Sequence, residues 1–121
     1  MPRILVVDDD VEILDLLRTM LEREHFEVLT ACDGNEALKL LDSEAIDVMI
    51  TDILMPEKEG IETILQLRKT HPQIKIIAIS GGGKGDANHY VYIAQWAGAD
   101  RVFTKPLDRT ELLRSIEELV T

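Results

Sequence analysis

The sequence predicts an α/β fold, a doubly wound five-stranded parallel sheet covered by helices on both faces. Short apolar runs rich in Val and Ile alternate with helical patterns along all 121 residues, without exception. The runs are continuously apolar instead of alternating with polar residues, as expected of strands that are buried on both faces. Parallel neighbours need crossover connections, and the helices between the runs supply them in the right-handed sense.

Each predicted strand is a short apolar run that a polar residue ends. In chain order, the predicted strands are residues 3–7, 26–31, 48–51, 75–79 and 101–103. The first strand ends abruptly at Asp8, and the third leads into Asp52. The fourth leads into Ser80, and the fifth ends just before Lys105. Polar side chains therefore collect at the carboxyl ends of the strands.

Each predicted helix has apolar residues three or four positions apart and a recognisable start or stop. In chain order, the predicted helices are residues 11–24, 36–42, 61–68, 87–97 and 109–120. Asp10 is the N-cap of the first helix, and the turn signal Asp33-Gly34 precedes the second. His71-Pro72 stops the third, and Gly98 ends the fourth. Each helix then has one apolar face to pack on the sheet.

Composition narrows the classes of function. Lys and Arg number 13 against 23 Asp and Glu, a formal net charge of -10 that opposes direct binding to nucleic acid. No apolar run reaches the roughly 20 residues of a membrane span, and Met1 opens no signal-peptide pattern. The only cysteine, Cys32, has no disulfide partner, and we expect a buried free thiol. We therefore expect a single cytoplasmic domain over 1–121, bound to neither nucleic acid nor membrane.

The chemically active side chains should meet at one edge of the sheet, because ligands of open α/β sheets bind outside the carboxyl ends of the strands. Asp8-Asp9 and Asp52 repel one another unless a cation relieves them, and oxygen ligands without His or Cys favour Mg²⁺. The Lys105 ammonium and the Ser80 hydroxyl suit the oxygens of a phosphoryl group. The pattern predicts a phosphoryl-transfer site with Asp52 as the nucleophile.

A set of short motifs occurs in chain order at these strand ends. They are Val6-Val7-Asp8-Asp9, Asp52-Ile53-Leu54-Met55-Pro56 with Gly60 beyond it, Ile79-Ser80, Ala97-Gly98-Ala99-Asp100 and Thr104-Lys105-Pro106. Together they resemble the receiver domains of two-component response regulators, and the resemblance covers essentially the whole chain. It implies a (βα)5 fold with the flavodoxin-like strand order 2-1-3-4-5.

The resemblance also implies a signalling role without an enzyme activity beyond self-catalysed phosphorylation and dephosphorylation. Asp52 would accept a phosphoryl group from a phosphohistidine of a sensor histidine kinase or phosphotransfer protein. Lys105 would pair with the phosphoryl oxygens, and Ser80 would turn its hydroxyl toward them, so that phosphorylation changes the protein surface. The implied ligands of Mg²⁺ are Asp8, partly through water, Asp9, Asp52 and the backbone carbonyl of Leu54.

The chain departs from the family pattern around the site. Val102 stands where receivers usually carry Tyr or Phe, with Phe103 next to it, so the ring to which the movement of Ser80 is usually coupled is not at this position. The loop after Ser80 holds four glycines within residues 81–85, and we expect the switch to lie there. Leu54 and Gly82 flank the expected path of a hydrolytic water, and neither can orient it, which predicts slow self-dephosphorylation.

The predicted helix over 87–97 has an apolar outer face. If Val91, Ala94 and Gly98 face the sheet, the residues that face away are His89, Tyr92, Ile93 and Trp96. Such a face favours a partner or dimer surface. Two alternatives remain: the glycine-rich loop covers it, or the helix rotates to bury Trp96. The resemblance implies that a downstream protein binds the face formed by 87–97, 101–103 and 109–120, which could also join two copies in a homodimer.

Two rival functions fit the same fold class. A phosphatase of the haloacid dehalogenase type would use Asp8 and Asp10 in a D-x-D arrangement, but that class needs Thr or Val where Glu12 stands. A flavin-binding flavodoxin-like module should carry a Ser- and Thr-rich phosphate loop after the first strand, where three acids stand. Phosphate labelling mapped to Asp52 or to Asp8 would separate the receiver from the phosphatase.

Overall fold

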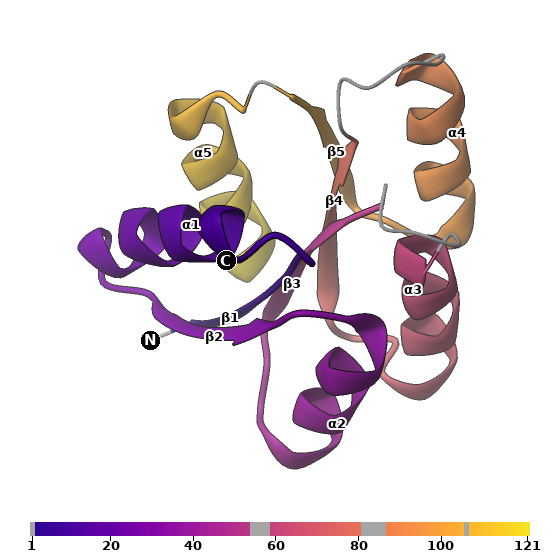
Figure 1. Cartoon of the computed structure of the whole chain (residues 1–121), viewed down its shortest axis with the longest axis horizontal. Coiled ribbons are helices and arrows are strands. Elements are labelled where there is room, and N and C mark those ends of the chain that lie inside the picture. Colours follow the sequence, from indigo (N-terminus) through magenta and orange to yellow (C-terminus); the bar gives the residue numbers. More distant parts are fainter. Residues whose placement is uncertain (1, 54–58, 81–86, 106) are drawn as a thin grey trace.

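The computed structural model describes the backbone of residues 2–53, 59–80, 87–105 and 107–121. Its five strands form one parallel sheet in the order β2-β1-β3-β4-β5, with helices between successive strands (Figure 1). The predicted fold class and strand order are confirmed. None of the helices in this described part combines the length and apolar character that a membrane span requires.

All the predicted elements are present, with ends that differ by at most two residues. The strands are β1 (Arg3–Val7), β2 (Glu27–Ala31), β3 (Val48–Asp52), β4 (Lys75–Ser80) and β5 (Arg101–Thr104). The helices are α1 (Val11–Arg23), α2 (Gly34–Ser43), α3 (Glu59–Thr70), α4 (Ala87–Ala97) and α5 (Arg109–Val120). The strands β3 and β4 extend through Asp52 and Ser80, so both side chains stand on the last residue of a strand.

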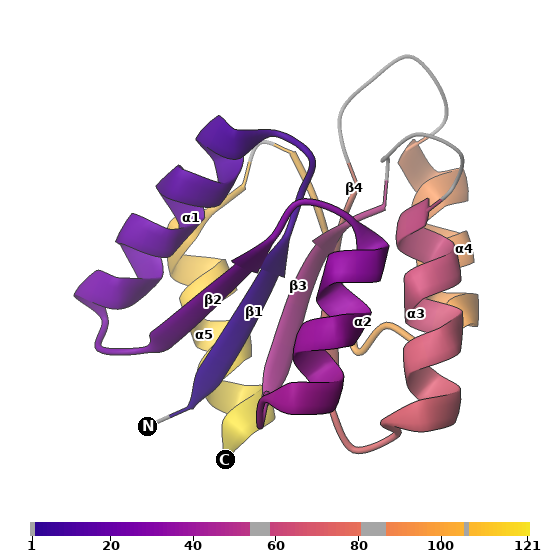
Figure 2. The same cartoon turned by 60° about the horizontal axis from the view of Figure 1, so that its bottom comes forward.

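Helices cover both faces of the sheet, α1 and α5 on one and α2, α3 and α4 on the other (Figure 2). The strand β1 shows why its apolar run is continuous. Ile4 and Val6 pack with α1 and α5, whereas Leu5 and Val7 pack with the opposite cluster. Alternate residues of a strand point to opposite faces, so a central strand between two helical layers needs apolar side chains at every position.

Aspartates begin the helices on the α1 and α5 face, as the sequence predicts for Asp10. An oxygen of Asp10 accepts the N–H of Glu12 at 2.9 Å, and Asp108 accepts that of Glu111 at 3.2 Å. The helix α2 begins two residues earlier than expected because Asp33 is its N-cap and accepts the N–H of Glu36 at 2.8 Å. These caps bind N–H groups that a helix leaves without partners in its first turn.

The expectation of a buried Cys32 thiol is wrong, because this side chain is exposed. The strand β2 ends at Ala31, which is buried, and the chain leaves the sheet at the next residue. The Cys32 thiol donates to a Glu36 oxygen at 3.1 Å, and this carboxylate raises the pKa of the thiol. Free cysteines are usually buried, but Cys32 lies between the end of β2 and Asp33, the N-cap of α2, where the chain is at the surface.

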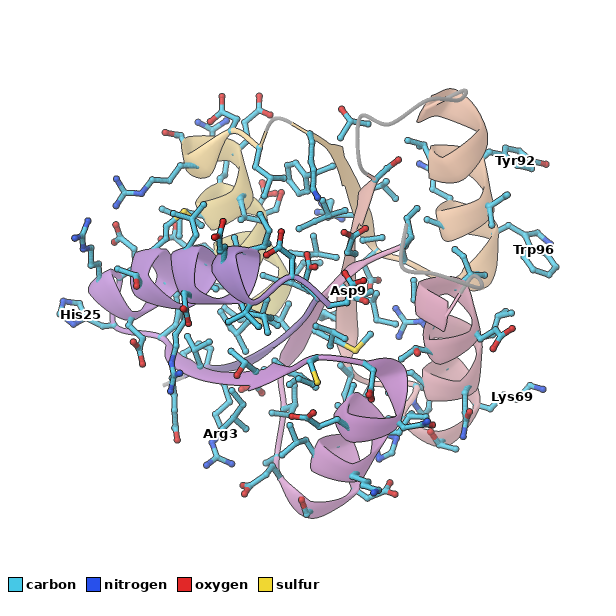
Figure 3. All side chains as sticks on the ribbon, viewed as in Figure 1. Arg3, Asp9, His25, Lys69, Tyr92 and Trp96 are labelled. Carbon is cyan, nitrogen blue, oxygen red and sulfur yellow. The ribbon has the colours of Figure 1, made fainter. Side chains whose placement is uncertain are left out.

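The outer face of α4 carries two large exposed side chains. Ala94 and Ala97 are buried, whereas Tyr92 and Trp96 are each 71% exposed and project away from the fold (Figure 3). The alternative in which the helix rotates to bury Trp96 is therefore excluded. His89 and the glycine-rich run 81–85 lie outside the residues whose side chains the structure describes.

Candidate functional site

The predicted site residues Asp8, Asp52, Ser80 and Lys105 lie at the carboxyl edge of the sheet. The strands β3 and β4 end on Asp52 and Ser80, while β1 and β5 end one residue before Asp8 and Lys105. The ends are level, because Asp52 is in register with Ile79 and Ser80 with Thr104. Figure 2 shows this edge at the top, away from the two chain termini.

Asp52 and Lys105 form an ion pair across the edge. The Nζ of Lys105 lies 3.5 Å from Oδ2 of Asp52, and Asp52 is buried with 7% of its surface exposed. The backbone N–H of Lys105 donates to the carbonyl of Ser80 at 3.0 Å, which fixes the root of the lysine side chain beside β4. A compact ammonium charge is thus held next to a buried carboxylate without the parallel, two-bond geometry that an arginine would impose.

The carboxyl of Asp8 is less acidic than an ordinary aspartate. Burial raises its pKa from 3.8 to about 6, and the charge of Asp52 adds to the rise, whereas the N–H of Asp10 and the ammonium of Lys105 oppose it. The N–H of Asp10 donates to Oδ1 of Asp8 at 2.8 Å. Burial and the nearby charge of Asp52 both disfavour the ionised form of Asp8. A cation bound at this point would therefore stabilise the two carboxylates.

Ser80 carries a buried hydroxyl that pairs with none of the described residues. Its side chain is fully buried, and Oγ makes no hydrogen bond to any residue in the described ranges. An unpaired buried hydroxyl costs free energy, so the structure favours a ligand oxygen or a water that would accept its proton. The hydroxyl stands at the end of β4, between the strands that carry Asp52 and Lys105.

The expected metal ligands are brought together in part. Asp8 and Asp52 are both buried at this edge. Asp9 is exposed where β1 passes into α1, and its side chain hydrogen-bonds that of Asp8 (Figure 3). Leu54 lies outside the described residues. Within the described ranges, no three His, Cys, Asp or Glu side chains are close enough to hold a metal ion. Two carboxylates still fit Mg²⁺, which keeps several waters and takes one or two carboxylates.

The structure shows that Val102 and Phe103 lie on opposite faces of the sheet. Val102 packs against the cluster of α2, α3 and α4, whereas Phe103 packs against the cluster of α1 and α5. Adjacent strand residues point to opposite faces of a sheet. The ring of Phe103 therefore lies on the other face and does not replace the aromatic side chain that receivers usually carry at the position of Val102.

Sequence reasoning missed a polar network at the opposite edge of the sheet. Arg68 in α3 pairs with Asp100, which precedes β5, and the two residues are 32 positions apart. The spacing of residues along the sequence does not predict a contact between an arginine in the last turn of α3 and an aspartate that follows α4. The run Ala97-Gly98-Ala99-Asp100 was a family motif in the sequence, but nothing in the motif indicated its partner.

Comparisons with known proteins give the family of the chain. The sequence profile of the response regulator receiver domain matches residues 4–117. The transcriptional regulatory protein CpxR of Escherichia coli (strain K12) is 39% identical over 120 residues, covering 99% of this chain and 50% of that protein. The alkaline phosphatase synthesis transcriptional regulatory protein PhoP of Bacillus subtilis (strain 168) is 34% identical over 118 residues, covering 98% and 48%. The chain thus spans about half the length of these curated relatives.

Solved structures show the same fold. A CheY-like receiver domain protein from Methanospirillum hungatei JF-1 is 33% identical with a TM-score of 0.87, covering 99% of this chain and 94% of that one. The response regulator TrrA of Thermotoga maritima, solved in complex with Mg²⁺-BeF, is 36% identical with a TM-score of 0.85, covering 98% and 99%. None of these findings favours the haloacid dehalogenase alternative. The chain belongs to the response regulator receiver domain family.

Proposed function

We propose that Asp52 is the phosphoacceptor of this receiver domain. An oxygen of the Asp52 carboxylate attacks the phosphorus of a phosphohistidine on a sensor histidine kinase or phosphotransfer protein. The phosphorus–nitrogen bond breaks, its electron pair stays on the imidazole nitrogen, and that nitrogen takes up a proton. The product is an acyl phosphate on Asp52.

The observation that carries this proposal is the Lys105 ammonium, 3.5 Å from Oδ2 of the buried Asp52. A phosphoryl group on Asp52 would bring its oxygens within reach of this cation, which would neutralise the added charge. The Oγ of Ser80, which has no partner among the described residues, could donate to another of these oxygens. Asp52, Ser80 and Lys105 would then each contact the transferred group.

Mg²⁺ is the proposed cofactor, which Asp9, Asp52 and the backbone carbonyl of Leu54 would hold, together with Asp8 partly through water. When bound, the ion neutralises charge on the phosphoryl oxygens and lowers the repulsion between the carboxylates. The raised pKa of Asp8, about 6, supports a requirement for a cation at this point. The TrrA structure holds Mg²⁺-BeF in a relative of this chain.

We further propose that the chain works as one cytoplasmic signalling domain, with no catalysis on a separate substrate. Phosphorylation would change the face formed by α4, β5 and α5, which would bind a downstream protein or join two copies of the chain. The exposed Tyr92 and Trp96 support an interaction role for α4, since large exposed apolar side chains favour interfaces. Direct contacts to nucleic acid or membrane are not part of the proposal.

The test is to incubate the chain with Mg²⁺ and ³²P-labelled acetyl phosphate and to map any acyl phosphate by reductive cleavage and mass spectrometry. Label on Asp52 that disappears in Asp52→Asn supports the proposal, and Asp47→Asn, at an exposed aspartate of the opposite edge, is the matched control. Label on Asp8 or sustained turnover of organic phosphates would overturn it. A run with EDTA in place of Mg²⁺ tests the cofactor.

A further inference from the structure

A second polar network joins the segments at the edge of the sheet opposite the site. Arg68, in the last turn of α3, donates from Nε to the carbonyl of Gly98 at 2.8 Å. Its Nη1 donates to the carbonyl of Ile74 at 2.6 Å, and its Nη2 pairs with Oδ2 of Asp100 at 2.5 Å. One half-buried guanidinium therefore connects the ends of α3 and α4 with the residues that lead into β4 and β5.

Asp100 forms the first contact between β5 and β4. Its Oδ2 accepts the N–H of Ile76 at 2.8 Å, and its own N–H donates to the carbonyl of Ile76 at 2.8 Å. The next residues along, Ile77 and Arg101, are the first pair of the strand register. Arg68 holds the Asp100 carboxylate in the position from which it accepts the N–H of Ile76. Arg68 therefore contributes to the alignment of β5 on β4.

The strand β5 has few other means to fix its register. It is an edge strand of four residues, with Arg101 and Thr104 exposed and Val102 and Phe103 only half-buried. Burial of one face of a strand specifies its register, and the burial of Val102 and Phe103 is incomplete. The ends of β5 therefore matter, and its carboxyl end leads directly to Lys105, whose N–H donates to the carbonyl of Ser80.

Gly98 lets Arg68 come close. Its φ is +120°, and a Cβ at this position would lie 2.8 Å from Cγ of Arg68, closer than real Cβ atoms come. Only glycine combines this backbone conformation with the space for the arginine. The local chain is thus shaped around the guanidinium group.

We infer that Arg68 is a positioning residue for the phosphoryl-transfer site. It acts through Asp100 and the register of β5 to hold Lys105 beside Asp52, from the opposite edge of the sheet. The inference rests on the proposed function of Asp52, because only that function gives the position of Lys105 a measurable consequence for a rate. The competing explanation is that α5, which follows Lys105, fixes the lysine by its own packing.

A double-mutant cycle on the whole chain separates these explanations. Arg68→Met removes the guanidinium but keeps an apolar stem, and the rate of Asp52 labelling by acetyl phosphate is measured with Lys105 present and in Lys105→Met. If Arg68 acts through Lys105, the rate falls about tenfold with the lysine present and less than about twofold without it. An equal loss in both backgrounds, or no loss in either, would overturn the inference.

Arg101→Met is the matched control, since Arg101 lies on β5 itself and pairs with Glu118 at 3.7 Å near the protein surface. Hydrogen exchange at the Lys105 amide should be faster in Arg68→Met and unchanged in Arg101→Met. If Arg68→Met does not fold, Asp100→Asn keeps an acceptor for Ile76 but loses the charge, and it should show the same dependence on Lys105. A wild-type chain that takes no label on Asp52 would refute the proposed function, while amide exchange would still test the register.

Discussion

The Nζ of Lys105 lies 3.5 Å from Oδ2 of Asp52, although 53 residues separate them along the chain. The two residues stand on strand ends that flank β4, so parallel pairing of β3, β4 and β5 brings them together. Because the Lys105 side chain is partly exposed, its ammonium group has room to shift when the negative charge at Asp52 moves outward onto a phosphoryl group. It can neutralise the unphosphorylated Asp52 and then the phosphoryl group attached to it.

Replacing Lys105 by methionine should slow phosphorylation of Asp52 by about a hundredfold, because one preorganised charged donor commonly contributes a factor of this size. The stem of the side chain is kept, so folding should be little affected. The measurement is the initial rate of labelling by acetyl phosphate with Mg²⁺, together with a thermal unfolding curve. Lys39→Met, at an exposed lysine of α2, is the control, and equal rates in the two variants would contradict the prediction.

The raised pKa of Asp8 predicts a pH dependence of stability. Because its pKa is about 6 in the folded chain against 3.8 ordinarily, the folded state binds a proton that the unfolded chain releases between these values. This contribution to stability is fully present below pH 4 and is lost as the pH rises through 6. In Mg²⁺-free buffer at pH 7, Asp8→Asn should therefore be more stable than wild type, by roughly 1 kcal/mol or more.

Urea unfolding from pH 4 to pH 7.5 with EDTA measures this effect. The difference in unfolding free energy between Asp8→Asn and wild type should grow with pH and then level off above the pKa of about 6. Asp15→Asn, at an exposed aspartate of α1, is the control. A difference that stays constant over the whole range would rule out Asp8 as the titrating group.

Much of the fold and of the site could be predicted from sequence because both depend on where strands end. The apolar run of β1 stops at Asp8, and the runs of β3 and β4 stop at Asp52 and Ser80. In a parallel sheet these ends meet at one edge, so the assignment of strands was enough to group the side chains. The distance from Lys105 to Asp52 bears out this grouping.

Other features depend on contacts that local patterns do not encode. The pairing of Arg68 with Asp100 joins distant residues through loop conformation, and the positive φ of Gly98 that permits it is not visible in composition. The end of β2 at Ala31 was predicted correctly, so the error at Cys32 has another source: the general tendency of free cysteines to be buried was applied to a residue that lies outside the strand.

His25 offers a test of backbone strain after α1. It is the non-glycine residue with positive φ, 68°, in the described chain, and its N–H donates to the carbonyl of Glu22 at 3.0 Å. Glycine adopts this conformation without steric cost, so His25→Gly should raise the unfolding free energy by about 0.5 to 1 kcal/mol. His25→Ala keeps the Cβ and should give no gain. Urea denaturation measures the unfolding free energy of both variants, and a glycine variant less stable than wild type would contradict the prediction.

The exposure of Trp96 predicts the fluorescence of the free chain. At 71% exposed, this single tryptophan should emit at the long wavelengths of a hydrated indole and be quenched by acrylamide almost as readily as in urea. A spectrum that shifts to shorter wavelength as protein concentration rises would indicate that a second copy covers α4. A blue-shifted, quencher-protected signal at all concentrations would contradict the position of Trp96.

The lifetime of the acyl phosphate should depend on Leu54, two residues beyond Asp52 and outside the described part of the structure. By resemblance to other receivers, the positions of Leu54 and of Gly82, which is also outside that part, flank the path of the hydrolytic water. A leucine offers that water no donor or acceptor, so the phosphorylated chain should lose its label slowly. Asparagine can hydrogen-bond the water, and Leu54→Asn should speed the loss about tenfold, equivalent to roughly 1.4 kcal/mol of barrier.

The measurement is the decay of ³²P label after the phosphodonor is removed, with Mg²⁺ present throughout. Leu16→Asn makes the same chemical change at a residue of α1 that is 64% exposed, and it should leave the decay unchanged. Rapid decay in wild type would mean that another group orients the water, because leucine cannot. Slow decay in both wild type and Leu54→Asn would instead show that access of water to the acyl phosphate, and not its orientation, limits hydrolysis.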